Sequence, residues 1–354
     1  MVWLSSWPHS PLCEVRVENQ RDTRRTPDLL HTCANTIKDM TTSDTTLKTA
    51  TADEPQMSKL NLIEWGRGSF LILIHIVTLI TVPLYFIFGN PSLGIILTAA
   101  AVYLVCNIGV TAGYHRLYAH RSYAIRSRLV EALVLMGGTL TLQDSVFFWA
   151  HDHRRHHRYV DTDKDPYAIT KGFWHAHFLW MMMKRDTYDP SGIRDLTARP
   201  LLRFQNRWYM PLALGLNVAV TIFAGIIFHD FFGAIALVLL ARLVLVYQST
   251  WFVNSLAHFW GTKPFSKEHT AVNNWIVALL TGGEGYHNFH HTFPSDYRNG
   301  VRWYQWDPTR VFIWTLSKLK LASNLRFVDR ATIQERIARE RRETMAATAA
   351  AAKA

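Results

Sequence analysis

The sequence predicts an all-α integral membrane protein with four transmembrane helices in two hairpins and a helical cytoplasmic cap. Charged residues make up only 18% of the 354 residues, against about 25% in soluble domains. Four apolar blocks have the length of about 20 residues that crosses about 30 Å of hydrocarbon. They lie at about 69–88, 93–112, 210–228 and 231–256. With such blocks, the net charge of +11 favours an anionic lipid bilayer as the partner and not nucleic acid.

Short turns join the blocks within each hairpin. The first is Gly89-Asn90-Pro91-Ser92, a strong turn signal, and the second is His229-Asp230. Neither turn contains Lys or Arg, whereas both residue types are frequent in 113–207 and after residue 258. The positive-inside rule therefore predicts that both termini and the cap, formed by 113–207 and 258–320, are cytoplasmic.

The remaining segments are expected to lie outside the spans. Residues 1–56 are polar without a sustained apolar period, which is typical of a disordered extension. The membrane domain is expected to cover 57–320, and 321–354 to form a charged helix with an Ala-rich tail. Two further apolar stretches, 129–148 and 173–183, are expected to be helices at the membrane–water interface.

Histidines cluster at the cytoplasmic ends of these predicted helices. One triplet has the spacing H-x-x-H-H, which puts three imidazoles on one face of a helix, and the same spacing recurs near residue 290. A lone histidine at an interface is usually an ordinary polar residue, but two triplets in one chain favour a metal site. The nine candidates are His115, His120, His153, His156, His157, His258, His287, His290 and His291.

Nine imidazoles are too many for one ion and suit two ions with four or five ligands each. Imidazole is a good ligand for iron, zinc, copper and nickel. Asn254, one turn before His258, could complete the set directly or through a water molecule. His151 would point to another face of the helix and is left out of this set. The three cysteines have no C-x-x-C spacing, so a thiolate metal site is not indicated.

Four runs of sequence resemble the membrane acyl-CoA desaturases of the stearoyl-CoA (Δ9) type. They are GVTAGYHRLYAHRSY, WAHDHRRHHRYVDTDKDPY, NSLAH and GGEGYHNFHHTFPSDYRNG, and the resemblance covers about 60–314. It implies a non-haem di-iron centre held by the nine histidines, with Asn254 bound through water. It also implies an O2-dependent enzyme that inserts a cis double bond, at the Δ9 position, into a saturated long-chain acyl-CoA for unsaturated fatty acid biosynthesis.

The resemblance also bears on source and partners. The run FPSDYRNGVRWYQWDPT is more similar to bacterial members, which implies the bacterial inner membrane; in a eukaryote the location would be the endoplasmic reticulum. The chain shows no haem-binding HPGG segment. Electrons are therefore expected from a separate protein of the cytochrome b5, ferredoxin or flavin reductase type.

Further roles are implied around the acyl chain and its head group. The resemblance implies a bent apolar tunnel for the acyl chain. The residues at its bend would be Gln143, Trp149, Thr250 and Trp251. Tyr103 would close its end, and Lys184 and Arg185 would bind the CoA phosphates. Packing alone could explain the two tryptophans. Anchoring at the membrane surface could explain the two basic residues. Asn107 replaces an expected small residue and His151 replaces the Arg of eukaryotic members. Chain length and acyl carrier therefore stay open.

Acidic residues near the histidines are candidates for orienting the imidazoles. A metal-bound histidine usually donates its second ring N–H to a carboxylate or carbonyl. The candidates are Asp152, Asp161, Asp165 and Glu284. Helix capping and turn formation would explain the three aspartates equally well.

Four alternatives stay open beside an acyl-CoA desaturase. A related histidine-box hydroxylase of lipids or alkanes, or a desaturase of lipid-linked acyl chains, would use the same ligand pattern. A bis-histidine haem electron carrier would place paired histidines inside the spans, where His75 is alone. A metal transporter would need polar ligands at mid-membrane.

Overall fold

The computed structural model describes residues 63–185 and 187–353. The predicted extension 1–56 lies outside these residues. The described chain is mostly helical, and its one sheet pairs β1 (Ala124–Ile125) with β2 (Ala322–Ser323) in antiparallel fashion. The prediction of an all-α protein is confirmed.

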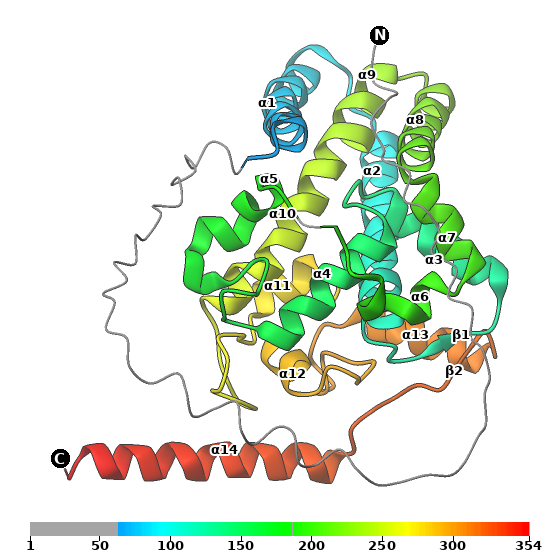
Figure 1. The fold of residues 1–354 in the computed structure, drawn as a ribbon. Helices are drawn as coiled ribbons and strands as arrows, with labels where there is room; N and C mark the ends of the chain where they lie inside the picture. The colour runs from blue at the N-terminus through cyan, green and yellow to red at the C-terminus, as the bar shows by residue number, and fades with distance from the viewer. Residues whose placement is uncertain (1–62, 186, 354) are drawn as a thin grey trace, which may run out of the picture. The chain divides into compact units, whose positions relative to one another are not determined.

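Four helices in the described part of the chain are long and apolar enough to cross a membrane, which confirms the predicted number (Figure 1). The first is α1 (Trp65–Phe88), and the second, Leu93–Ala119, combines α2 (Leu93–Ile108) with the π-helical segment η2 (Gly109–Ala119). The third is α8 (Tyr209–Phe228). The fourth, Phe231–His258, contains α9 (Phe231–Gly233), η6 (Ala234–Ala241), α10 (Arg242–Asn254) and η7 (Leu256–His258).

Further helices form the region between and after the spans. In chain order they are α3 (Arg128–Thr139), α4 (Val146–Tyr159), η3 (Ile169–Lys171), η4 (His175–Leu179), α5 (Trp180–Met182), η5 (Pro190–Ile193), α6 (Arg194–Thr197), α7 (Pro200–Arg207), α11 (Trp275–Leu280), α12 (His287–Thr292), α13 (Pro308–Lys318) and α14 (Arg330–Ala351). Helix α14 includes most of the Ala-rich end of the chain.

Local sequence explains where the first hairpin begins and turns. The Glu64 carboxylate accepts hydrogen bonds from the free backbone N–H groups of Gly66 and Arg67 at the start of α1. Ser92 caps α2 in the same way through the N–H of Ile95. The second span then continues as helix beyond the predicted end at residue 112. This extension carries His115 out of the apolar block while keeping it on a rigid element.

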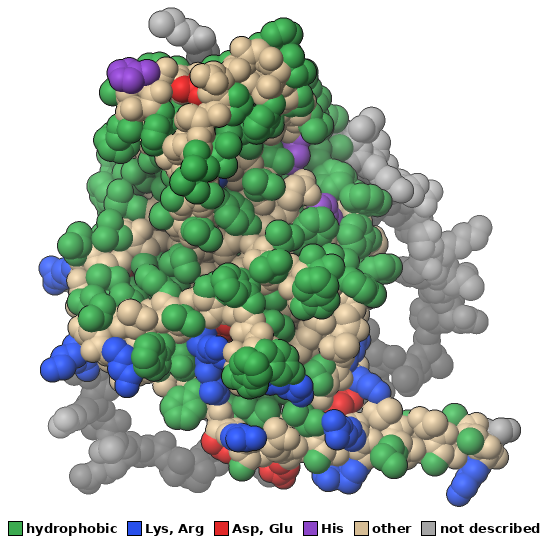
Figure 2. Space-filling view, turned by 180° about the vertical axis from the view of Figure 1, so that it is seen from behind, with side chains coloured by type: hydrophobic (Ala, Val, Ile, Leu, Met, Phe, Trp, Pro, Cys, Tyr) green, Lys and Arg blue, Asp and Glu red, His purple; other side chains and the backbone are tan. Residues whose placement is uncertain are grey.

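The surface divides into an apolar and a basic region. In Figure 2, hydrophobic side chains cover the upper part of the molecule, and Lys and Arg side chains gather below them. Long apolar side chains on the spans are exposed, including Leu79, Phe88, Leu93 and Phe223, each at least 66% exposed. Such a belt is what lipid contact requires. The structure therefore has the character of a multi-pass membrane protein.

The stretch 129–148 is a helical hairpin and not a single helix. Its first arm, α3, lies against the second span, where a side chain at Gly109 would meet the backbone of Gly138 at 2.1 Å. Glycines at this crossing therefore allow the two backbones to touch. The chain turns at 140–145 and returns as α4, which carries the first histidine triplet.

Candidate metal centre

The nine histidines come from four segments of the described chain and meet in two groups. His115 lies on η2, and His120 directly follows the end of η2. Helix α4 contributes three histidines, the end of the fourth span contributes one, and α12 contributes three. The i, i+3, i+4 spacing puts each triplet on one helix face. The two triplet faces turn toward one another: His156 and His157 on α4 lie within 3.2 Å of His291 and His290 on α12.

The first cluster consists of His115, His120, His153, His157 and His290. One ring nitrogen from each lies within 4.8 Å of the others. The Nε2 atoms of His115 and His290 are 3.0 Å apart, those of His120 and His153 2.8 Å, and those of His157 and His290 2.9 Å. Five nitrogens thus converge on one point.

The second cluster consists of His156, His258, His287 and His291, again with their ligand atoms within 4.8 Å of one another. The Nε2 atom of His291 is 3.2 Å from that of His156 and 3.1 Å from that of His287. The Nε2 atom of His258 is buried and has no hydrogen-bond partner among the described residues. This cluster has one nitrogen fewer than the first.

The donor set fits two transition-metal ions. Two facing neutral imidazole nitrogens can share at most one proton, so most of the converging lone pairs lack a donor, and a cation would satisfy them. Burial, reinforced by the neighbouring imidazoles, lowers the pKa of six of these residues well below the usual value of 6.5: His120, His153, His157, His287, His290 and His291. Burial therefore favours the neutral form that binds metal.

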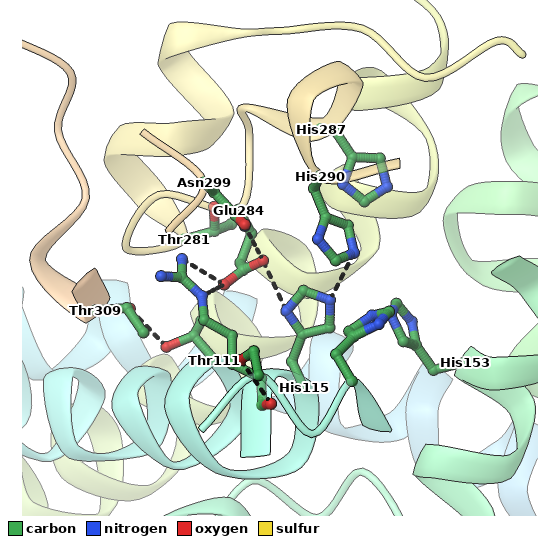
Figure 3. A network of polar contacts seen from close by, with 12 residues as sticks. Thr111, His115, His153, Thr281, Glu284, His287, His290, Asn299 and Thr309 are labelled. Atoms are coloured by element: carbon green, nitrogen blue, oxygen red, sulfur yellow. Dashed lines mark hydrogen bonds and ion pairs between the residues drawn. The ribbon is translucent and has the colours of Figure 1, made fainter. Parts of the chain in front are cut away.

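A buried carboxylate holds the first cluster from outside. Glu284 lies 2.8 Å from Nδ1 of His115 and accepts hydrogen bonds from Arg116 (3.0 Å) and Asn299 (2.6 Å) (Figure 3). Burial alone would raise the pKa of Glu284, but the adjacent His115 ring and the Arg116 guanidinium outweigh it and lower this pKa to about 2. Glu284 is therefore ionised and lies where a carboxylate can orient the His115 ring.

Other groups orient the remaining rings. Asp165 lies 2.9 Å from Nδ1 of His156, in the second cluster. Asp161 acts one step further out: it accepts hydrogen bonds from the backbone N–H and hydroxyl of Thr270, whose hydroxyl lies 2.8 Å from Nδ1 of His258.

Asp152 differs from the expectation that it orients a cluster histidine. Its carboxylate pairs with Arg185 at 2.8 Å and lies 3.3 Å from His151. Neither partner belongs to the two clusters. The reason is helical geometry: Asp152 precedes His153 by one residue, so the two side chains point about 100° apart around α4.

Cavities adjoin the first cluster. One is lined by His115, His153, Trp149, Val110, Val246 and Thr250, among others. A second shares Trp149, His153, Thr250 and Asn254 with it and adds Gln143 and Trp251. The Gln143 side chain donates to the Thr250 hydroxyl at 2.9 Å, and Trp149 stacks on His153 with ring centroids 5.0 Å apart. All four residues predicted at the tunnel bend thus lie beside these cavities.

The other predicted substrate residues lie further out. The Tyr103 hydroxyl and the Asn107 amide both donate to the backbone carbonyl of Leu280, at 2.6 and 2.9 Å. Asn107 also lines the first cavity. Lys184 is exposed, whereas Arg185 forms ion pairs with Asp144 (2.7 Å) and Asp152.

Several residues around the clusters follow no sequence pattern that predicts their role. The Tyr167 hydroxyl lies 3.1 Å from Nδ1 of His153, and the only hint was its place in the acidic turn after the first triplet. Thr270 and Arg116 belong to no spacing pattern. The ring of His269 packs against the second cluster, with its centroid 5.2 Å from that of His291.

Comparison with known proteins agrees with this site. Residues 90–350 match the family model described as fatty acid desaturase. The probable acyl-CoA desaturase of Schizosaccharomyces pombe is 39% identical over 79% of this chain and 59% of its own length, and acyl-CoA desaturase 1 of Saccharomyces cerevisiae is 41% identical over 69% and 48%. This chain therefore spans about half to three-fifths of these two yeast relatives.

A relative of more similar length is the sn-2 palmitoyl-lipid 9-desaturase of Nostoc sp. (strain 36). It is 33% identical over 77% of this chain and 92% of its own length. The match to the family model extends over more than half of the chain and includes all nine histidines. The chain belongs to the fatty acid desaturase family.

Proposed function

We propose that this protein is an O2-dependent fatty acyl desaturase that inserts a cis double bond, at the Δ9 position, into a saturated long-chain acyl-CoA. The observation that best supports this is the contact between the first histidine cluster and largely apolar cavities: the Trp149 ring stacks on His153 and lines both of them. An acyl chain in these cavities would pass directly beside the cluster.

The nine histidines would hold two iron ions, one in each cluster, with Asn254 completing the set through a water molecule. When bound, iron supplies with O2 the oxidising power needed to remove hydrogen from an unactivated methylene group. The overall reaction takes two hydrogen atoms from the acyl chain and two electrons and two protons from outside, and reduces O2 to two water molecules.

The protein's own residues would orient the site and exclude water. Glu284, held by Arg116, keeps His115 in the tautomer whose Nε2 lone pair faces the cluster. Val110, Val246 and Val253 contribute apolar wall to the cavity beside the first cluster, and this apolar surface would disfavour water next to the metal centre. The Gln143–Thr250 hydrogen bond would close one side of the chain path and set its bend.

The acyl carrier and the electron donor belong to the same proposal. Lys184 and Arg185 would meet the CoA phosphates, and because Arg185 already pairs with Asp144 and Asp152, binding would compete with those ion pairs. The name of the Nostoc relative makes a lipid-linked acyl chain the second candidate substrate. A separate redox protein would deliver electrons to the Lys- and Arg-rich side, which we expect to be cytoplasmic.

Fatty acid profiling of an expressing host would test this function. We expect a new cis-monounsaturated fatty acid, with its double bond located at carbon 9 by mass spectrometry after derivatisation. Purified protein in lipid nanodiscs, given labelled stearoyl-CoA or stearoyl-phosphatidylcholine, would distinguish the carrier. A hydroxylated fatty acid as the main product would exclude desaturation, and a stoichiometric Soret band would exclude the di-iron assignment.

A further inference from the structure

Arg242 is a buried cation in the middle of the fourth span. It is 1% exposed and lies roughly 16 Å from the start of this span by helical rise, within a hydrocarbon core of about 30 Å. None of the ion pairs found among residues 63–185 and 187–353 involves Arg242. A charge at this depth is costly and is retained where it has a function.

The guanidinium group instead binds dipoles from three neighbouring elements. Its Nη1 donates to the backbone carbonyl of Leu140 at 3.0 Å, and its Nη2 donates to the side-chain carbonyl of Asn217 on α8. The Asn217 amide donates to the same Leu140 carbonyl at 3.1 Å. A third donor, Nε, satisfies the carbonyl of Val238 on its own helix.

Leu140 is the residue at which α3 ends. The carbonyls of a helix C-terminus have no partner in their own helix and carry partial negative charge. This end also lies at membrane depth, because Arg242 contacts Cys106, roughly 20 Å from the start of the second span by helical rise. Helix α3 is therefore deeper than the interfacial position expected from the sequence. The carbonyls at its end, which have no partner within the helix, need a hydrogen-bond donor from elsewhere in the protein.

The turn that follows cannot hold its shape alone. Leu142 and Asp144 have φ of +53° and +84°, a region in which residues other than glycine are strained. Besides the Arg242 contact, Tyr247 donates to the Leu142 carbonyl at 3.3 Å and the Asp144 N–H donates to Tyr209 at 2.9 Å. Side chains of the third and fourth spans thus fix the turn.

We propose that Arg242 is a positioning residue: it caps the membrane-buried end of α3 and so fixes the turn 140–145. That turn places Gln143 against Thr250, and it leads into α4, which carries Trp149 and the first histidine triplet. The cap thereby sets where the bend of the acyl path lies relative to the metal centre. This consequence for the product rests on the proposed desaturase function; the cap itself does not.

Backbone amide exchange in nanodiscs would test the cap without any activity. In Arg242→Met we expect peptides covering 138–146 to exchange at least tenfold faster than in the unmodified protein. Arg242→Lys should show an intermediate exchange rate, because lysine keeps the charge but has only a single donor group. Thr221→Val is the matched control, since this buried hydroxyl contacts only the carbonyl of Asn217 in its own helix. Unchanged exchange at 138–146 in either Arg242 variant would overturn the cap, as would equal acceleration at 287–292.

The product profile tests the positioning role. We expect Arg242→Met to raise the fraction of displaced double bonds several-fold at unchanged iron content, with partial rescue by Arg242→Lys. A lower yield with the same double-bond position would overturn this role. If the unmodified protein made no unsaturated product, the proposed function would fail, whereas the exchange measurement would still decide whether Arg242 is the cap. If Arg242→Met did not fold, Arg242→Lys would supply both readouts.

Discussion

The two histidine clusters are built alike at their centres and differently around them. The first has five nitrogens, and a buried carboxylate, itself bound by Arg116 and Asn299, holds its His115. The second has four nitrogens. A buried carboxylate, Asp165, lies beside its His156, but its His258 is oriented by a hydroxyl, and the Nε2 of His258 has no hydrogen-bond partner among the described residues. Only the first lines the cavities. If the proposed function holds, this difference predicts that the first cluster is the more rigid, substrate-facing site and that the second leaves room for a further ligand.

Removing one ligand from each cluster should have the largest effect. We expect His290→Ala and His156→Ala each to abolish turnover and to lower bound iron below two per chain, because each removes a converging nitrogen. Iron would be measured by mass spectrometry on purified protein. His151→Ala is the matched control, since it lies on the same helix as His156 but outside both clusters. Full iron content in either cluster variant would show that the assigned ligand set is wrong.

The outer carboxylates should come next. Replacing an outer-shell partner typically costs 10- to 100-fold in metal affinity or activity. We expect Glu284→Gln to show the larger loss, since it also leaves the buried charge of Arg116 with Asp307 as its only carboxylate. Asp165→Asn should show a loss of metal affinity near the lower end of this range. Iron release to a chelator would measure both, and the comparison fails if Asp165→Asn loses iron faster than Glu284→Gln.

The metal-free protein should lose stability as pH falls. Burial lowers the pKa of four histidines of the first cluster, so they stay neutral in the folded state while the unfolded chain takes up protons below about pH 6.5. The unfolded state then binds more protons, and the free energy of unfolding falls by up to about 1.4 kcal/mol per pH unit for each such group. Thermal unfolding of chelator-treated protein between pH 8 and 5 would show this. A flat Tm below pH 6.5 would contradict it.

Much of this architecture is readable from the sequence because its signals are local. Apolar length identifies the spans, and the H-x-x-H-H spacing marks histidines on one helix face. The extension of the second span to Ala119 could not be predicted, because polarity changes there while the helix continues. The capping of α3 by Arg242 depends on a contact between residues about 100 positions apart, which no spacing rule reveals. For the same reason Asp152 was assigned to the histidines although its partner is Arg185.

The smallest effects should come from the two hydroxyls that contact the histidines. Tyr167→Phe removes a hydrogen bond to His153 in the first cluster, and Thr270→Val removes one to His258 in the second. Each should cost about 1 kcal/mol, roughly a fivefold faster release of one iron out of two. Thr270→Ser keeps the hydroxyl and should behave as the unmodified protein.

Which iron is released faster would sharpen the comparison. Because Glu284 also holds the first cluster, Tyr167→Phe should weaken it less than Thr270→Val weakens the second, where the free Nε2 of His258 makes ring orientation decisive. Stopped-flow chelation would resolve the two phases. If Tyr167→Phe accelerated release more than Thr270→Val, the second cluster would be the more rigid one, and the assignment of rigidity to the substrate-facing side would have to be reversed.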